Sequence, residues 1–345
     1  MTLDRAEAAV RQARKTWLIT GAAGFVGSHL AERLLRLGQT VVAIDNFCNG
    51  SCANLAAIEA AVDSADFARF RFVEGDLRDF ETCCDVCQGI DIVLHQAVLG
   101  SVAQSIEIPL EIHESNVIGS LNLMWASVNA GVERFVYASS SSVYGDHVSL
   151  PIHEDLACRP LSPYAVGKLV CEIYARNFFE AYRLPTIGLR YFNIYGPRQQ
   201  VDGAYAAVIP CFIRGLARGE PVRIYGDGSA SRDFCFIEDV VQANLLAASG
   251  DADACFGQSF NVCSSEQTSI LELFELIRQN FEDRYRLPVC APLHVDPRPG
   301  EIRHSCGDYG RIANKLGYQP AYRFADGLPV TLDWFVRELE ILAES

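Results

Sequence analysis

Residues 15–27 read KTWLITGAAGFVG, an apolar run followed by a glycine-rich turn. The apolar run at residues 15–20 predicts a buried strand, and residues 28–37 predict an amphipathic helix. Between them Gly21, Gly24 and Gly27 stand at G-x-x-G-x-x-G spacing, where glycine permits a tight turn and close approach of the backbone to a ligand. The N–H groups of the first helical turn suit a pyrophosphate. We therefore expect this turn, including Phe25 and Val26, to bind a dinucleotide.

An acidic residue after the next strand indicates which dinucleotide is bound. Residues 40–44 predict a strand that ends at Asp45, close to the roughly 20 residues beyond the glycines at which an acid holds the adenosine ribose. A carboxylate there repels the 2′-phosphate of NADP, so we predict NAD, with Asn46 beside it. Asp76 and Leu77, which follow a strand predicted at residues 70–74, are expected near the adenine. The alternative is that Asp45 only ends a strand.

Strands and helices continue to alternate along the chain. Further strands are predicted at residues 91–94, 134–138 and 186–190, with a helix at residues 110–130. This alternation predicts an α/β fold, a Rossmann-like doubly wound parallel sheet with helices on both faces. Ligands of such sheets bind beyond the carboxyl ends of the strands, where Gln96, Ala97 and the four serines at residues 139–142 fall.

The pattern becomes irregular after residue 190. Helices predicted near residues 209–219, 271–281 and 328–342 are joined by irregular segments. We predict an NAD-binding Rossmann domain at residues 1–190, which also receives part of residues 233–265. Residues 191–345 are expected to form a smaller mixed α/β domain that binds the substrate. A short helix is expected before the first strand, with Ala6, Ala9, Val10 and Ala13 on one side.

A second functional stretch, SPYAVGK, follows at residues 162–168. Pro163 suits the first turn of a helix, and Tyr164 and Lys168, four residues apart, then share one face. The lysine cation and a bound nicotinamide are expected to lower the pKa of Tyr164 by about three units, which requires roughly 4 kcal/mol. The phenol can then take a proton from an alcohol whose carbon is being oxidised. The alternative is an ordinary helical pair, because Y-x-x-x-K alone is a weak pattern.

Composition argues against several classes of protein. The 345-residue chain has a net charge of −14, so we expect no binding to nucleic acid or to an anionic membrane. It has no apolar run near the roughly 18 residues of a membrane span, and its N-terminus lacks the apolar core of a signal peptide. We predict a cytoplasmic protein whose 13 cysteines are mostly buried thiols. Cys83, Cys84 and Cys87 have metal-like spacing but no histidine or second pair, so no metal is predicted.

The motifs together resemble those of the extended short-chain dehydrogenase/reductases that act on nucleotide sugars, the NAD-dependent epimerase/dehydratase family. The resemblance rests on GAAGFVG at residues 21–27, SVYGD at 142–146, Tyr164 with Lys168, RYFN at 190–193 and RDF at 232–234. It covers nearly the whole chain in order. More narrowly, LHQAVLGSV at 94–102, SRDFCFIED at 231–239 and IRHS at 302–305 are similar to the bacterial UDP-N-acetylhexosamine 4-epimerases of O-antigen and capsule synthesis. Those relatives carry Pro-Arg and Lys-Trp where this chain has Ala103-Gln104 and Cys211-Phe212.

This resemblance implies a role for each matching residue. The catalytic residues would be Ser140, Tyr164 and Lys168. NAD would be contacted by Gly21, Gly24, Phe25, Val26, Gly27, Asp45, Asn46, Asp76, Leu77, Gln96, Ala97, Asn116, Tyr164, Lys168 and Tyr191. The UDP-sugar would be contacted by Ser101, Ser140, Ser141, Ser142, Tyr164, Asn193, Ala207, Val208, Arg232, Arg298 and Ser305.

The resemblance also implies a reaction. C4 of the sugar would be oxidised with NAD while Tyr164 accepts the O4 proton, and the 4-keto sugar would be reduced on its other face. Dehydratases and UDP-glucuronate decarboxylases look different after the serine strand, with Thr-Asp-Glu and Thr-Ser-Glu in place of residues 140–142. Three serines supply neither an acid nor a base. These reactions, and a non-catalytic NAD-binding scaffold, are the alternatives to an epimerase.

The sugar and the assembly are implied in the same way. Ser305 stands where enzymes restricted to UDP-glucose carry tyrosine, which favours an N-acetylated sugar over UDP-glucose, UDP-galactose or a UDP-hexuronate. The helices at residues 110–130 and 163–182 would pair across a two-fold axis as a four-helix bundle, giving a homodimer.

Overall fold

A seven-stranded parallel sheet forms the centre of the computed structural model, which describes residues 3–147, 149–200, 207–249, 252–287, 289–297 and 303–339. The strand order is β11-β6-β5-β4-β1-β2-β3. The strands are β1 (Thr16–Thr20), β2 (Thr40–Asp45), β3 (Phe70–Glu74), β4 (Ile92–His95), β5 (Arg134–Ser140), β6 (Thr186–Tyr191) and β11 (Gln258–Val262). The order reverses between β1 and β4, which is where ligands bind in open α/β sheets.

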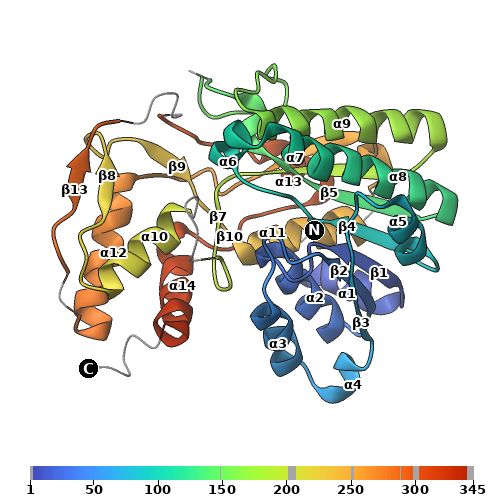
Figure 1. The fold of residues 1–345 in the computed structure, drawn as a ribbon, viewed down its shortest axis with the longest axis horizontal. Coiled ribbons are helices and arrows are strands. Elements are labelled where there is room, and N and C mark those ends of the chain that lie inside the picture. The colour runs from blue at the N-terminus through green and yellow to red at the C-terminus, as the bar shows by residue number, and fades with distance from the viewer. Residues whose placement is uncertain are drawn as a thin grey trace.

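Helices cover both faces of this sheet (Figure 1). One layer contains α1 (Leu3–Gln12), α2 (Phe25–Arg36) and α11 (Ile237–Ser249), and the other contains α5 (Phe80–Cys87), α8 (Gly119–Ala130) and α9 (Pro163–Tyr182). Strand residues alternate between the two layers: Trp17 and Ile19 pack with the first, whereas Leu18 packs with the second. This alternation is what a parallel sheet buried on both faces requires.

Shorter elements connect or cap these layers. They are α3 (Cys52–Ala61), α4 (Ser64–Phe67), α6 (Val102–Glu107), α7 (Pro109–His113), the π-helical turn η1 (Glu114–Ile118), the 3₁₀ turns η2 (Ser141–Tyr144) and η3 (Asp253–Cys255), and α13 (Gly310–Leu316). The predicted helix at residues 110–130 is therefore α7, η1 and α8 in succession.

The rest of the C-terminal half lies beside the carboxyl edge of the sheet (Figure 1). It contains the helices α10 (Val208–Ala217), α12 (Ile270–Tyr285) and α14 (Phe324–Glu338). Three two-stranded sheets join β10 (Cys235–Phe236) to β7 (Ile194–Tyr195), β12 (Gln267–Ser269) to β9 (Ser231–Asp233), and β13 (Leu293–Val295) to β8 (Arg223–Tyr225).

The predicted fold class is confirmed, with differences in detail. Each predicted strand of the main sheet is present within two residues of its expected bounds, but β11 and α11 were not recognised as such in the sequence. The helix after the glycine turn begins at Phe25 rather than at residue 28. Ala13 lies beyond the end of α1 and is exposed, whereas Ala6 and Val10 are buried against α11 and α2. The division into domains at residue 190 stays a prediction.

Among the residues described, no helix is both long and apolar enough to cross a membrane.

Candidate functional site

The glycine turn between β1 and α2 leaves no room for side chains. Gly21 has φ +68°, and a Cβ placed on it would lie 2.8 Å from the Ala97 backbone nitrogen. A Cβ on Gly27 would lie only 2.1 Å from the Gly21 carbonyl oxygen. No side chain caps the N-terminus of α2, and its first turn carries no acidic residue. The N–H groups there are available to an anion, as a pyrophosphate site requires.

Asp45 lies at the carboxyl end of β2, beside this turn. Its two oxygens accept the backbone N–H groups of Ala23 at 3.0 Å and Phe47 at 2.8 Å, which fixes the carboxylate. Burial raises the pKa of Asp45. Asn46 donates to Asp76 at 2.9 Å, and Arg78 pairs with the same carboxylate, so the side-chain hydrogen bond to Arg78 lowers the pKa of Asp76 to about 2. The geometry suits a ribose beside Asp45.

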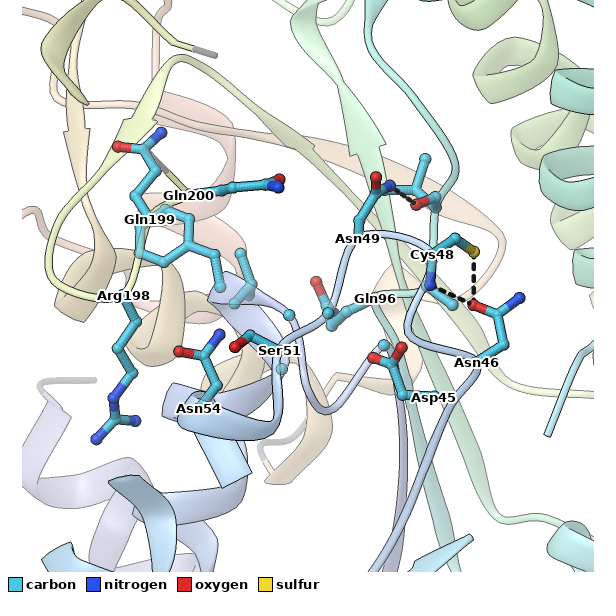
Figure 2. A pocket seen from close by; sticks show the side chains of 18 of the residues that line it. Asp45, Asn46, Cys48, Asn49, Ser51, Asn54, Gln96, Arg198, Gln199 and Gln200 are labelled. Atoms are coloured by element: carbon cyan, nitrogen blue, oxygen red, sulfur yellow. Dashed lines mark hydrogen bonds between the residues drawn. The ribbon is translucent and has the colours of Figure 1, made fainter. Parts of the chain in front are cut away.

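The glycine turn, Asp45, Asn46 and Asp76 line a cavity of about 890 Å³, and Figure 2 shows Asp45 and Asn46 in its wall. Predicted site residues that line it are Gly21, Gly24, Phe25, Val26, Gly27, Asp45, Asn46, Asp76, Leu77, Gln96, Ala97, Ser101 and Ala207. Predicted residues that do not line it are Asn116, Ser140, Ser141, Ser142, Tyr164, Lys168, Tyr191, Asn193, Val208, Arg232 and Ser305. The cavity thus contains the predicted dinucleotide loop but not the predicted catalytic trio.

One wall of this cavity was not predicted from the sequence. Gln199 and Gln200 lie across the cavity from Asn46 and Cys48 in Figure 2 and, like Arg198, follow the YFN motif. Arg198 Nη1 and Gln199 Oε1 are buried without a hydrogen-bonding partner. Orphaned polar atoms and a side-chain-free turn together fit a large polar ligand such as NAD. The sequence GPRQQ at residues 196–200 contains no motif that indicates ligand binding, apart from its position after RYFN.

A chain of hydrogen bonds with a defined direction joins the Ala97 N–H, after β4, to the Asn116 carbonyl. His95, at the end of β4, is buried, and burial lowers its pKa to about 3, so the ring is neutral. Its Nε2 lies 2.8 Å from Ser120 Oγ, and Ser120 donates to the Asn116 carbonyl at 2.5 Å. Nε2 therefore carries the ring proton, and Nδ1 accepts a hydrogen bond from Thr20 Oγ1 at 2.7 Å. The same Thr20 oxygen accepts from Ala97 N at 3.1 Å.

The side-chain amides of Asn116 and Gln96 hold neighbouring segments of the chain by hydrogen bonds. The Asn116 amide accepts from Leu99 N at 2.7 Å and donates to Leu99 O at 3.0 Å. Gln96 accepts from the Tyr191 hydroxyl at 3.0 Å and donates to Asn244 at 3.1 Å. Both amides thus fix the path of the chain at the carboxyl edge of the sheet.

Ser140 and Tyr164 come together at the end of β5. The Tyr164 phenol is hydrogen-bonded to the Ser140 side chain, which also accepts from Ser142 Oγ at 2.9 Å. Ser141 and Ser142 continue into η2. Ser162 caps α9, accepting from Ala165 N at 3.2 Å, with Pro163 in the first turn as predicted. The helix therefore begins where Tyr164 reaches the serine strand end.

The predicted lowering of the Tyr164 pKa is wrong for the groups that this chain supplies. Burial raises the pKa of Tyr164 to about 12, and the hydrogen bond to Ser140 offsets only part of the rise. Lys168 Nζ lies 5.8 Å from the centre of the phenol ring and donates instead to the Ala138 carbonyl at 2.8 Å. Burial also lowers the pKa of Lys168. The four-residue spacing correctly predicted that Tyr164 and Lys168 lie near each other on α9. It did not predict that the Lys168 ammonium donates to the Ala138 carbonyl.

Three of the predicted substrate residues, Asn193, Arg232 and Ser305, lie around β9 and residues 303–308. Asn193 donates to the Asp233 carbonyl at 3.0 Å, and Arg232 Nη1 donates to the Ser231 carbonyl at 2.9 Å. Ser305, 8% exposed, donates its N–H to the Ser231 carbonyl at 3.1 Å. Ala207 and Val208 form the start of α10. Arg298 lies outside the described residues.

The three cysteines with the spacing of a metal site lie on α5, where Cys83 and Cys87 are buried. In the described ranges, no group of three or more histidine, cysteine, aspartate or glutamate side chains is placed to hold a metal ion.

Comparisons with known proteins bear on this site. Residues 17–263 match the family model described as NAD dependent epimerase/dehydratase family. The UDP-glucose 4-epimerase of Mycolicibacterium smegmatis is 36% identical over 323 residues, which cover 92% of this chain and 97% of that protein. The UDP-N-acetyl-alpha-D-glucosaminuronate decarboxylase of Bacillus cytotoxicus is 31% identical over 335 residues, covering 95% of this chain and 99% of that protein. A solved UDP-N-acetylglucosamine 4-epimerase from Methanobrevibacter ruminantium M1, in complex with UDP-N-acetylmuramic acid, has a TM-score of 0.85 and 34% identity, covering 94% of this chain and 99% of that one.

Proposed function

Because the chain belongs to the NAD-dependent epimerase/dehydratase family, we propose that it is a C4 epimerase that interconverts UDP-GlcNAc and UDP-GalNAc. NAD is its cofactor and, when bound, supplies the oxidation of the C4 alcohol and the reduction that restores it. The observation that carries the proposal is the meeting of the Ser140 and Tyr164 hydroxyls at the carboxyl end of β5. No carboxylate stands at residues 140–142, where elimination would need an acid or a base.

Each catalytic side chain has a distinct task in this proposal. Ser140 holds the O4 atom of the sugar, and Tyr164 accepts the O4 proton and later returns it. Since burial raises the pKa of Tyr164 to about 12, the phenol needs positive charge nearby to act at neutral pH. Lys168 is this chain's contribution, and its bond to the Ala138 carbonyl keeps the ammonium on the strand that bears Ser140.

A decarboxylase is a second candidate because of the 31% identity to the Bacillus cytotoxicus protein. The carboxylate that α9 buries near this point is Glu172, and it is paired with Arg190 and accepts from Ser139. A carboxylate held in this way is committed to its own partners, which favours epimerisation.

The choice of an N-acetylated sugar rests on Ser305. The wall around it is tightly packed: a Cβ on nearby Gly307 would lie 2.7 Å from Cys263 Sγ and from the Phe192 ring. A large side chain at position 305 could not be relieved easily in such a wall, so a serine there leaves room beside the sugar.

Exposed apolar side chains on α6, α7 and α9 support a homodimer. Ile106, Leu110 and Ile173 are 66%, 78% and 62% exposed, and we call them the α6–α9 face. These helices lie together on one side of the molecule (Figure 1). On α9, Val166 is also exposed, whereas Phe178 is buried against the sheet. A self-complementary pairing of this face would cover it.

Incubation of the purified protein with UDP-GlcNAc, followed by proton NMR, tests the proposal. Formation of UDP-GalNAc supports it. A product that has lost water or carbon dioxide from a suitable UDP-sugar, with no epimer formed, would instead assign one of the alternatives.

A further inference from the structure

A buried ion pair begins a line of polar contacts behind the catalytic strand end. Glu172 and Arg190 are 8% and 9% exposed and form two hydrogen bonds, at 2.9 Å from Arg190 Nε and 2.6 Å from Nη2. Ser139, which precedes Ser140 in β5, donates to the same carboxylate. The line therefore starts one residue from the proposed active-site serine.

Tyr144 continues this line of polar contacts beyond the Glu172–Arg190 pair. It is the last residue of η2, is fully buried, and its ring lies 4.8 Å from the Arg190 guanidinium. Its hydroxyl accepts from Arg190 Nη1 at 2.8 Å and donates to Asn261 Oδ1 at 2.6 Å. A single oxygen thus joins the ion pair to β11, and both of its partners are buried.

Asn261 connects the line to the segment that bears Ser305. Its Nδ2 donates to the Ile152 carbonyl at 2.9 Å and to the Asp308 carbonyl at 3.1 Å. Ile152 in turn donates its N–H to the Cys306 carbonyl at 2.8 Å, and Asp308 donates its N–H to the Ile152 carbonyl at 2.8 Å. Asn261 therefore sits at the junction between Ile152 and residues 306–308.

We infer that Tyr144 and Asn261 are positioning residues that fix the segment bearing Ser305 relative to the strand end bearing Ser140. This inference rests on the proposed function, since it assigns the two ends of the line to the reacting O4 and to the C2 substituent of one sugar. Each buried donor and acceptor in the line is paired, and so a shift of either end leaves a polar atom unsatisfied. The distance between the catalytic hydroxyl and the sugar wall is thereby held constant.

Tyr144→Phe tests the inference because it removes one oxygen and keeps the ring. Tyr195→Phe is the matched control: Tyr195 is also buried, and its hydroxyl donates at 3.3 Å to the Phe324 carbonyl, outside the line. The readouts are kcat/KM for UDP-GlcNAc, the Kd for UDP alone, the NAD content, and hydrogen exchange at the amides of Ile152 and Asp308.

We expect Tyr144→Phe to lower kcat/KM by about tenfold or more, because a small misplacement of a substrate is costly. The Kd for UDP and the NAD content should stay within about twofold of wild type, because UDP alone does not reach the sugar wall. The Ile152 and Asp308 amides should exchange hydrogen about tenfold faster in Tyr144→Phe than in wild type, and at the wild-type rate in Tyr195→Phe. Asn261→Asp, which keeps the acceptor for Tyr144 but loses both Nδ2 bonds, should reproduce these effects if Tyr144→Phe fails to fold.

The inference is overturned if Tyr144→Phe matches Tyr195→Phe in kcat/KM and in exchange. It is also overturned if the affinity for UDP falls in parallel with kcat/KM, since the line would then support the whole fold rather than the sugar site. A wild-type protein that turns over no UDP-sugar refutes the proposed function instead, and the exchange comparison then decides alone whether Tyr144 fixes residues 306–308.

Discussion

The Glu172–Arg190 pair gives the most quantitative prediction for stability. Glu172→Gln keeps the shape of the side chain but leaves the Arg190 guanidinium, 9% exposed, without a counter-charge. Two charges about 3 Å apart attract by about 5–6 kcal/mol at an effective dielectric constant of about 20. Desolvation offsets part of this attraction in the pair, but removing one partner typically costs about 3–5 kcal/mol of unfolding free energy. We expect a loss in that range.

The same helix supplies a control for this variant. Arg176 and Glu180 form a pair at 2.9 Å on α9, but their side chains are 72% and 58% exposed. Glu180→Gln should cost less than about 1 kcal/mol, because water screens an exposed pair. Urea titrations followed by circular dichroism measure both losses.

A double substitution tests whether the two charges depend on each other. Replacing both Glu172 and Arg190 with methionine removes the charges together, so its cost should be smaller than that of either single methionine variant. The reasoning is refuted if Glu172→Gln costs no more than Glu180→Gln. It is refuted equally if the double variant loses the sum of the two single losses.

Three further predictions concern activity, specificity and assembly. Tyr164→Phe should keep its fold and NAD content but lose about 10²- to 10⁴-fold in epimerisation rate, since its hydroxyl is the proposed acceptor of the O4 proton; turnover near the wild-type rate would contradict that role. Ser305→Tyr should lower kcat/KM for UDP-GlcNAc and UDP-GalNAc and leave kcat/KM for UDP-glucose unchanged; unchanged turnover of the N-acetylated sugars would show that Ser305 does not determine whether an N-acetyl group fits. Leu110→Asp, at 78% exposure on the α6–α9 face, should give a monomer by light scattering, whereas Leu271→Asp on α12, at 42% exposure, should remain a dimer. A monomeric wild type at micromolar concentration would contradict the dimer.

Local signals in the sequence predicted the elements that they control directly. Gly21 and Gly27 stand where a Cβ would collide with the backbone, so their spacing reports a steric requirement of the turn. Helix α9 has the bounds expected from the sequence, because Ser162 caps it and Pro163 starts it. These features depend on a few neighbouring residues and are therefore visible without the fold.

Features that depend on distant packing were missed. Eleven of the thirteen residues of α11 are buried, so it shows no polar face and no helical period, and it was not recognised. Strand β11 is short and, among the described strands, pairs with β6 alone, 71 residues away in sequence at each register pair, such as Phe260 with Leu189. Burial, which raises the pKa of Tyr164 against the lowering expected from Lys168, was not visible in the sequence because it is a property of the assembled site. Likewise, Arg198 and Gln199 reach the cavity from a segment far from the glycine turn.

The proposed reaction inverts C4 of a UDP-sugar by removing hydrogen from that carbon and returning it to the other face. The most direct test is to incubate the wild-type protein in ordinary water with UDP-GlcNAc that carries deuterium at C4, and to analyse the product by NMR and mass spectrometry. Transfer of the C4 hydrogen to NAD and back within one site predicts UDP-GalNAc that keeps the deuterium at C4. A product that has lost the label to solvent, or the absence of UDP-GalNAc, would contradict it.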